Sequence, residues 1–148
     1  MPFTRTTDAV DSNACRRAVT HPLYEFAERY TAAWCSQNPD QVAAFFAVDG
    51  VLTINGGTPH VGRTAIAESA ASFMAAFPDL VVALRTVESH DDRVWYDWLL
   101  TGTNTGLGGT GRSVRINGRE AWRMTADGLI ADSIGSFDVA DYERQLTA

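Results

Sequence analysis

The first half of the chain carries its apolar residues at helical spacing. In the segment PLYEFAERYTAAWCSQN (22–38) the apolar positions fall on one stripe of a helix, with Pro22 suited to the first turn. That stripe consists of Leu23, Phe26, Ala27, Tyr30 and Trp34. Asn38, Pro39 and Gln41 then have the order of a helix cap, a first helical residue and a capping-box partner. They predict a second helix, and its expected buried side is Val42, Phe45 and Phe46.

A third helix is expected from Thr64 until just before Pro78. Its apolar side consists of Ile66, Ala70, Phe73, Met74 and Phe77. The second half of the chain changes to the period-two alternation of β-strands. After a short strand at 51–54, longer strands are expected at 80–89, 94–104, 113–124 and 129–137, and a short helix at 138–146. Helices first and a strand meander after them predict an α+β fold, with three N-terminal helices packed on a curved, mostly antiparallel sheet.

The stretch WLLTGTNTGLGGTGRSVRING (98–118) contains the spacing of a dinucleotide-binding loop. Gly106, Gly108 and Gly111 match G-x-G-x-x-G, but such a loop must open a helix. Here the next residues, 113–117, alternate between polar and apolar as a strand does. The glycines are therefore expected in a hairpin loop, and a nucleotide site is excluded. Gly118 is expected to mark a bulge or a close approach of another group.

The same alternation assigns the two faces of the predicted sheet. On the strand at 94–104 the odd-numbered set includes Asp97, which belongs in water, so the even-numbered residues face inward. On the next strand Glu120 shares the inward stripe with Val114, Ile116, Trp122 and Met124. An ionised carboxylate is costly on an apolar face unless it is paired. Two interpretations stay open: a structural Glu paired with an arginine or turned outward by a bulge, and a general base with a raised pKa in an apolar pocket.

Other polar and aromatic positions are weaker candidates. Asn104 ends the inner row of its strand, where it is a ligand donor or an ordinary turn residue. Tyr30 and Trp34 are core residues or pocket residues whose polar tips need partners. Asp138 is expected to cap the last helix. Trp95 on the outer face suggests a homodimer that covers that face of the sheet.

Composition limits the class of protein. The chain has 148 residues, 45% of them apolar, and a net charge of −6, which fits one domain and disfavours nucleic acid and anionic membrane as partners. We expect a polar tail at 1–21 without a signal peptide, followed by a single domain at 22–148. Cys15 and Cys35 are expected to be free thiols in a reducing cytoplasm. The three histidines lie far apart, so no metal site is predicted.

Several short segments in order resemble the nuclear transport factor 2-like superfamily, and within it the SnoaL-like polyketide cyclase group. They are GRTAI (62–66), FPDL (77–80), TGTNTG (101–106), DGLI (127–130) and the closing FD…QL (137–146). The resemblance, which runs from Tyr24 to Leu146, implies a cone-shaped fold with a deep apolar cavity between helices and sheet. It also implies an intramolecular aldol closure without metal or cofactor, in which an aspartate on the last strand is acid and base.

This chain departs from the group's pattern at the positions that carry chemistry. The aspartate position falls on Gly135, or on Ser136 if the strand has a bulge, and a family histidine on the preceding strand falls near Glu120. Another histidine of the group is replaced by Asn104. The arginine and first aspartate of the related epoxide hydrolases would fall at Trp98 and Leu100, which disfavours epoxide hydrolysis.

Two functions follow as hypotheses. The first is a small cofactor-free enzyme that cyclises or isomerises an apolar carbonyl compound, such as a polyketide, with Glu120 as the base. Asn104, Tyr30 or Ser136 would donate hydrogen bonds to the developing enolate oxygen. The walls of the cavity would be Trp34, Trp98, Trp122, Phe73 and Phe77. The alternative is a non-catalytic small-molecule-binding or interaction protein, which the missing last-strand aspartate favours.

Overall fold

The computed structural model describes residues 9–147, with side chains from Pro22 onward. In chain order its elements are α1 (Ala9–Trp34), α2 (Pro39–Ala43), β1 (Phe46–Ile54), β2 (His60–Val61), α3 (Arg63–Ala76), β3 (Val81–His90), β4 (Arg93–Thr103), β5 (Ser113–Met124), β6 (Ile130–Phe137) and α4 (Val139–Thr147). The strands form one sheet in the order β2-β1-β6-β5-β4-β3. Only the pairing of β1 with β6 is parallel. The predicted α+β fold with a mostly antiparallel sheet is confirmed.

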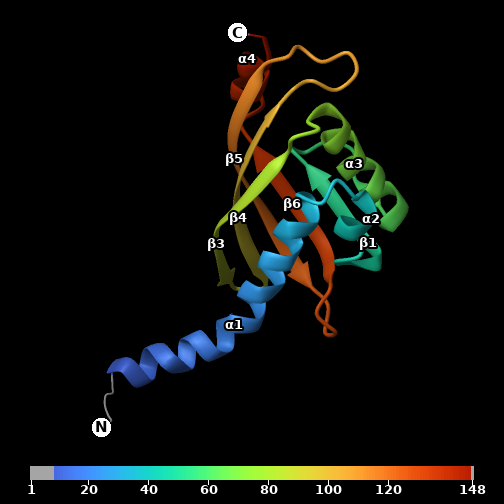
Figure 1. Cartoon of the computed structure of the whole chain (residues 1–148). Coiled ribbons are helices and arrows are strands. Elements are labelled where there is room, and N and C mark those ends of the chain that lie inside the picture. Colours follow the sequence, from blue (N-terminus) through green and yellow to red (C-terminus); the bar gives the residue numbers. More distant parts are fainter. Residues whose placement is uncertain (1–8, 148) are drawn as a thin grey trace.

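The sheet curves around α1, α2 and α3, whereas α4 lies beside the first residues of β5 (Figure 1). The core fills the space between these helices and the concave face. The predicted inward positions are confirmed: on β4 and β5 the buried apolar side chains are Val94, Tyr96, Leu100, Val114, Ile116 and Trp122. Within the described residues, no helix is long and apolar enough to cross a bilayer.

The expected helix start at Pro22 is wrong, because α1 begins at Ala9 and Pro22 lies inside it. Residues 9–21 of the predicted tail are therefore helical, and residues 1–8 lie outside the described part. This end of α1 projects from the body (Figure 1). A buried stripe was the signal used to place the helix, and a segment that projects from the body needs none.

The boundary between α2 and β1 was also predicted wrongly. The helix ends at Ala43, and Phe46 begins a strand of nine residues instead of extending the helix. Phe46 pairs with Ile130, and the register of β1 against β6 then shifts before Val51. An apolar residue such as Phe46 suits a helix or a strand, so the neighbouring β6 decides its conformation.

The hairpin around the glycine-rich loop is confirmed. The strands β4 and β5 pair without interruption from Thr103 opposite Ser113 to Val94 opposite Trp122. The register is continuous at Gly118, so this residue forms no bulge. It is a site of close approach: a Cβ added there would lie 2.1 Å from the Trp98 ring.

Trp95 lies on the outer face as predicted, but its own chain covers it. The His90 ring stacks on it at 3.8 Å between centroids, and the Arg119 guanidinium lies 4.1 Å from the ring centroid. The side chain is half-buried as a result. An exposed Trp95 therefore no longer supports the homodimer, which stays a prediction.

Candidate active site

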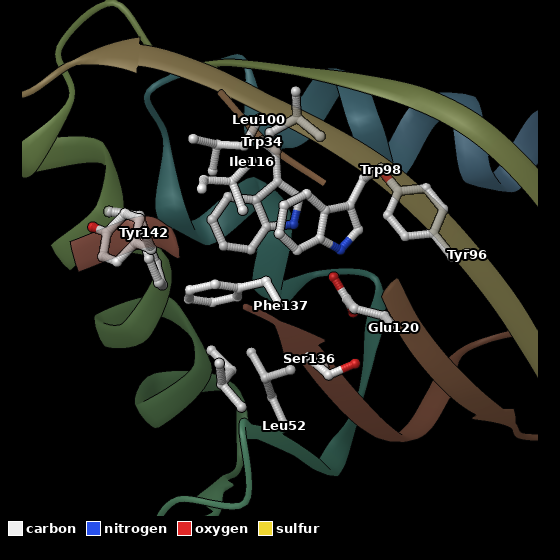
Figure 2. A pocket seen from close by; sticks show the side chains of 14 residues that line it. Trp34, Leu52, Tyr96, Trp98, Leu100, Ile116, Glu120, Ser136, Phe137 and Tyr142 are labelled. Carbon is white, nitrogen blue, oxygen red and sulfur yellow. The ribbon is translucent and has the colours of Figure 1, made fainter. Parts of the chain in front are cut away.

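A cavity of about 60 Å³ lies between the helices and the concave face of the sheet, with α4 at its rim (Figure 2). Its walls consist of Trp34, Leu52, Ile54, Phe73, Val82, Tyr96, Trp98, Leu100, Ile116, Glu120, Gly135, Ser136, Phe137 and Tyr142. Glu120 is the only carboxylate among them. The volume is well below the roughly 300–1,000 Å³ of pockets for drug-sized ligands. As folded, the cavity suits a compact molecule or the end of a larger one.

The side chain of Glu120 is 7% exposed and faces inward from β5. Three neutral groups donate hydrogen bonds to its Oε1 atom: Ser133 Oγ at 2.7 Å, Trp122 Nε1 at 3.0 Å and the Tyr30 hydroxyl at 3.0 Å. Within the described residues the Oε2 atom accepts a hydrogen bond from the Tyr30 hydroxyl alone, also at 3.0 Å. Oε2 is thus the carboxylate oxygen with capacity left for a ligand or a proton. In Figure 2 the carboxylate points toward the aromatic walls.

Strand geometry explains why these donors meet at one carboxylate. Trp122 follows Glu120 by two residues on β5, so the two side chains share a face. On β6, Ser133 pairs with Trp122 and Gly135 pairs with Glu120. Tyr30 reaches the same point from α1, with its ring packed edge-on against Trp122 at 5.2 Å. One helix and two strands therefore hold Glu120 in place.

Burial raises the pKa of Glu120, because leaving water disfavours the charged form. The hydrogen bonds from Trp122, Ser133 and Tyr30 lower the pKa, but burial has the larger effect. No ion pair among the described residues includes Glu120. Arg119 pairs instead with Asp97 on the outer face, Nε to Oδ1 at 2.6 Å. The interpretation of Glu120 as one half of a structural ion pair is therefore wrong.

Two tyrosines near Glu120 stay neutral and act as donors. Burial raises the pKa of Tyr30 well above its usual value, and the charge of Glu120 raises it further. Burial likewise raises the pKa of Tyr96. The Tyr96 hydroxyl lies 2.5 Å from Thr31 Oγ1, which itself donates to the Ala27 carbonyl at 2.7 Å. Thr31 Oγ1 therefore accepts the hydrogen bond that Tyr96 donates, and Glu120 is the carboxylate at this site that can act as a base.

The model of the SnoaL-like domain matches residues 27–133, most of the chain. The chain belongs to the SnoaL-like family. No protein with a curated description matches its sequence.

Solved structures show the same fold for this SnoaL-like chain. A hypothetical protein from Catenulispora acidiphila with a ketosteroid isomerase-like fold, in complex with trimethylamine, has a TM-score of 0.73 at 20% identity, covering 82% of this chain and 92% of its own. A putative SnoaL-like polyketide cyclase from Jannaschia sp. CCS1 has a TM-score of 0.68 at 16% identity, and the match covers 84% of this chain and 93% of its own. AclR, a putative hydroxylase from Streptomyces galilaeus, has a TM-score of 0.72 at 20% identity, and the match covers 86% of this chain and 82% of its own. At these identities the likeness shows the fold alone.

The structure sorts the predicted site residues of this SnoaL-like protein into three groups. Trp34, Phe73, Trp98 and Glu120 line the cavity as expected. Tyr30 and Trp122 lie behind Glu120 and bind its carboxylate instead of lining the cavity. The third group lies elsewhere: Phe77 in the core, Asn104 in the hairpin loop and the Ser136 side chain on the outer face of the sheet.

Phe77 is fully buried in the core and is not among the residues that line the cavity, so its role as a ligand contact stays a prediction. It ends α3 beside Gly102, where its Cβ lies 3.1 Å from the position of an added Cβ. Asn104 organises the hairpin loop instead of facing a ligand. Its Nδ2 donates to the Ala76 carbonyl at 3.1 Å, and its Oδ1 accepts from the Thr110 N–H at 2.8 Å. The turn interpretation of Asn104 is thus confirmed.

Ser136 borders the cavity, but its hydroxyl does not point into it. Its Cα pairs with that of Arg119, whose side chain binds Asp97 on the outer face. Paired residues point to the same side of a sheet, so the Ser136 side chain lies on the outer face as well. The predicted role of Ser136 as a donor to an enolate is therefore wrong.

The sequence reasoning missed Ser133, Tyr96, Phe137 and Tyr142. The alternation on β6 carried a usable signal, since Ser133, Gly135 and Phe137 are spaced by two and all face inward. Gly135 is the position that the family resemblance assigned to the catalytic aspartate. A Cβ at Gly135 would lie 3.7 Å from Glu120 Cγ, an ordinary contact. Glu120 therefore has no second carboxylate facing it from β6.

Proposed function

We propose that the protein is an acid/base enzyme that isomerises or cyclises a compact carbonyl compound, with Glu120 as the only proton-transfer group. The observation that carries this proposal is a buried carboxylate that lines an otherwise apolar cavity and whose Oε2 atom accepts a hydrogen bond from Tyr30 alone among the described residues. A base is most effective when its pKa is near the working pH, and burial moves the pKa of Glu120 in that direction. The proposed chemistry requires no cofactor.

The reaction balances with one carboxylate. Ionised Glu120 takes the proton from a carbon beside the carbonyl, and the C–H electron pair moves into the enolate. In an isomerisation Glu120 returns this proton to a different carbon. In a cyclisation the enolate carbon attacks a second carbonyl of the same molecule, and Glu120 gives the proton to the new alkoxide oxygen. Glu120 ends each cycle ionised, so a second acid at position 135 is not required.

The enolate oxygen needs donors other than those predicted from the sequence. The Tyr30 hydroxyl is bound to Glu120, and Tyr96 is bound to Thr31. Trp98 and Tyr142 are lining residues that carry an indole N–H and a hydroxyl, and within the described residues these groups bind no acceptor. These two groups are the proposed donors to the substrate oxygen.

The alternative is a binding protein without chemistry. Two observations favour it: Gly135 stands where the family's acid is expected, and the cavity is small. The relative that holds trimethylamine supports binding of a compact molecule by this fold. Proton exchange at carbon distinguishes the alternatives, because a protein that only binds leaves the rate at its value in buffer.

The test uses small cyclic ketones in D₂O, with exchange of the hydrogens beside the carbonyl followed by NMR. Conversion of cyclohex-3-enone to its conjugated isomer, followed by absorbance, is a second readout. The Glu120→Gln variant keeps the shape and removes the base, so its rate should fall by about two to four orders of magnitude. Glu88→Gln, the same change at an exposed carboxylate on β3, is the matched control. A wild-type rate equal to buffer, or an active Glu120→Gln variant, would refute the proposal.

A further inference from the structure

Among the residues whose side chains are described, the carboxylate in this cavity has no positive partner. Its three donors are a phenol, an indole and an alcohol, and none of them carries a charge. The chain contains no lysine, and the described ion pairs use arginines elsewhere. A buried anion without a countercharge is costly, and this burial raises the pKa of Glu120.

Six aromatic residues line the cavity together with aliphatic ones. They come from five elements and are Trp34, Phe73, Tyr96, Trp98, Phe137 and Tyr142. Several of them meet edge to face: Trp98 with Phe137 at 6.1 Å, and Phe137 with Tyr142 at 5.4 Å between centroids. The negative face of such rings attracts cations, and several rings around one carboxylate form an aromatic cage for alkylated ammonium groups.

We propose that this cavity binds compact alkylammonium ions, with the methyl groups against the aromatic rings and the charge beside Glu120 Oε2. The inference rests on the proposed function in taking the cavity as the ligand site, but it does not depend on catalysis. A neutral ligand of the same shape fills the cavity and leaves the anion without a countercharge. An anionic ligand is repelled. Only a cation supplies the positive charge that the Glu120 carboxylate lacks. The small cavity restricts that cation to a compact one.

Binding of such a cation is coupled to loss of the Glu120 proton. Below the pKa of Glu120 in the free protein, affinity should rise by about tenfold per pH unit and then level off above it. The other titratable groups that face Glu120 are Tyr30 on α1 and Tyr96 on β4. Burial raises the pKa of both, so they stay neutral over this range. From β6 the neighbour is Ser133, and from β1 the cavity receives only Leu52 and Ile54.

The experiment compares choline with 3,3-dimethylbutan-1-ol, which has the same shape with carbon in place of the charged nitrogen. Calorimetry with the whole protein measures both affinities from pH 4.5, the ordinary pKa of a glutamate, up to pH 8.5, so the series starts below the raised pKa of Glu120. Choline should bind at least tenfold more tightly than the alcohol at pH 8.5, and its affinity should rise with pH while that of the alcohol does not. Choline binding should also release a proton, seen as an enthalpy that depends on the buffer.

Substitutions distinguish the effects of the carboxylate and of the rings on choline binding from the effect of the overall charge. The net charge of −6 attracts any cation, and Glu88→Gln reduces it by the same amount as Glu120→Gln. Only Glu120→Gln should abolish the preference for choline. Trp98→Leu should weaken the binding of choline more than the binding of the alcohol.

The proposal is overturned if the alcohol binds as tightly as choline at pH 8.5, if neither ligand binds, or if the affinity for choline does not change with pH. The pH series needs only the wild-type protein, so it decides the matter even if Glu120→Gln does not fold. The ketone exchange experiment uses a different readout. Its failure removes the proposed enzyme and leaves cation binding intact, and the reverse also holds.

Discussion

Replacing Gly118 with alanine should destabilise the protein, because the Trp98 ring occupies the space of the new methyl group. The added Cβ would lie 2.1, 2.3 and 2.6 Å from three atoms of that ring. Carbon atoms in contact normally lie about 3.5–4.0 Å apart, so the ring has to move by roughly 1 Å or more. Such overpacking costs about 1–3 kcal/mol. Alanine also lowers the conformational entropy of the unfolded chain, which offsets about 0.4–1 kcal/mol and leaves a net loss of roughly 0–2.6 kcal/mol, with a central value of about 1.3 kcal/mol.

Urea unfolding followed by tryptophan fluorescence measures this loss as a lower midpoint at unchanged slope. In a thermal scan each kcal/mol corresponds to about 2–4 °C at this chain length. Gly135→Ala is the matched control on the neighbouring strand. Its Cβ would lie 3.7 Å or more from its neighbours, and its stability should stay within about 0.5 kcal/mol of wild type.

A double-mutant cycle tests whether the Trp98 ring is the cause. In a Trp98→Leu background the ring is gone, so Gly118→Ala should cost much less there than in the wild type. Equal costs in both backgrounds would refute the reasoning, as would a Gly118→Ala variant as stable as Gly135→Ala. The same displacement changes a cavity wall, so the affinity of a cavity ligand should change in Gly118→Ala as well.

Two further predictions concern pH and assembly. Burial raises the pKa of Glu120 in the folded state, so its contribution to stability is fully present below its ordinary pKa of 4.5 and is lost as pH rises through the folded value. Urea unfolding from pH 4 to 8 should therefore show Glu120→Gln gaining stability relative to wild type as pH rises, and parallel profiles would contradict this. On the outer face Trp95, Ala121 and Ile134 are cross-strand neighbours, and Ile134 is 48% exposed. We expect light scattering to give about twice the 16.1 kDa of one chain and Ile134→Asp to give a monomer; a monomeric wild type would exclude the homodimer.

The faces of the sheet could be predicted from the sequence because side chains alternate along a strand whatever its partners are. This rule alone placed Glu120 inward, and it turned the glycine-rich segment into a hairpin loop before any contact was known. On β6 the same rule points Ser133 and Gly135 inward and Ser136 outward. The exclusion of a nucleotide site has the same physical basis, since a strand follows the last glycine where a helix would be required.

What surrounds Glu120 depended on the tertiary structure. The register of β6 against β5 brings Ser133 next to Trp122, and the path of α1 brings Tyr30 to the same carboxylate. These contacts join residues up to 90 positions apart in the chain, and local periodicity carries no information about such distances. The same limit applies to Phe46, a β-strand residue because β6 lies beside it. Local pattern determines which way a side chain points, whereas packing between elements determines what it meets.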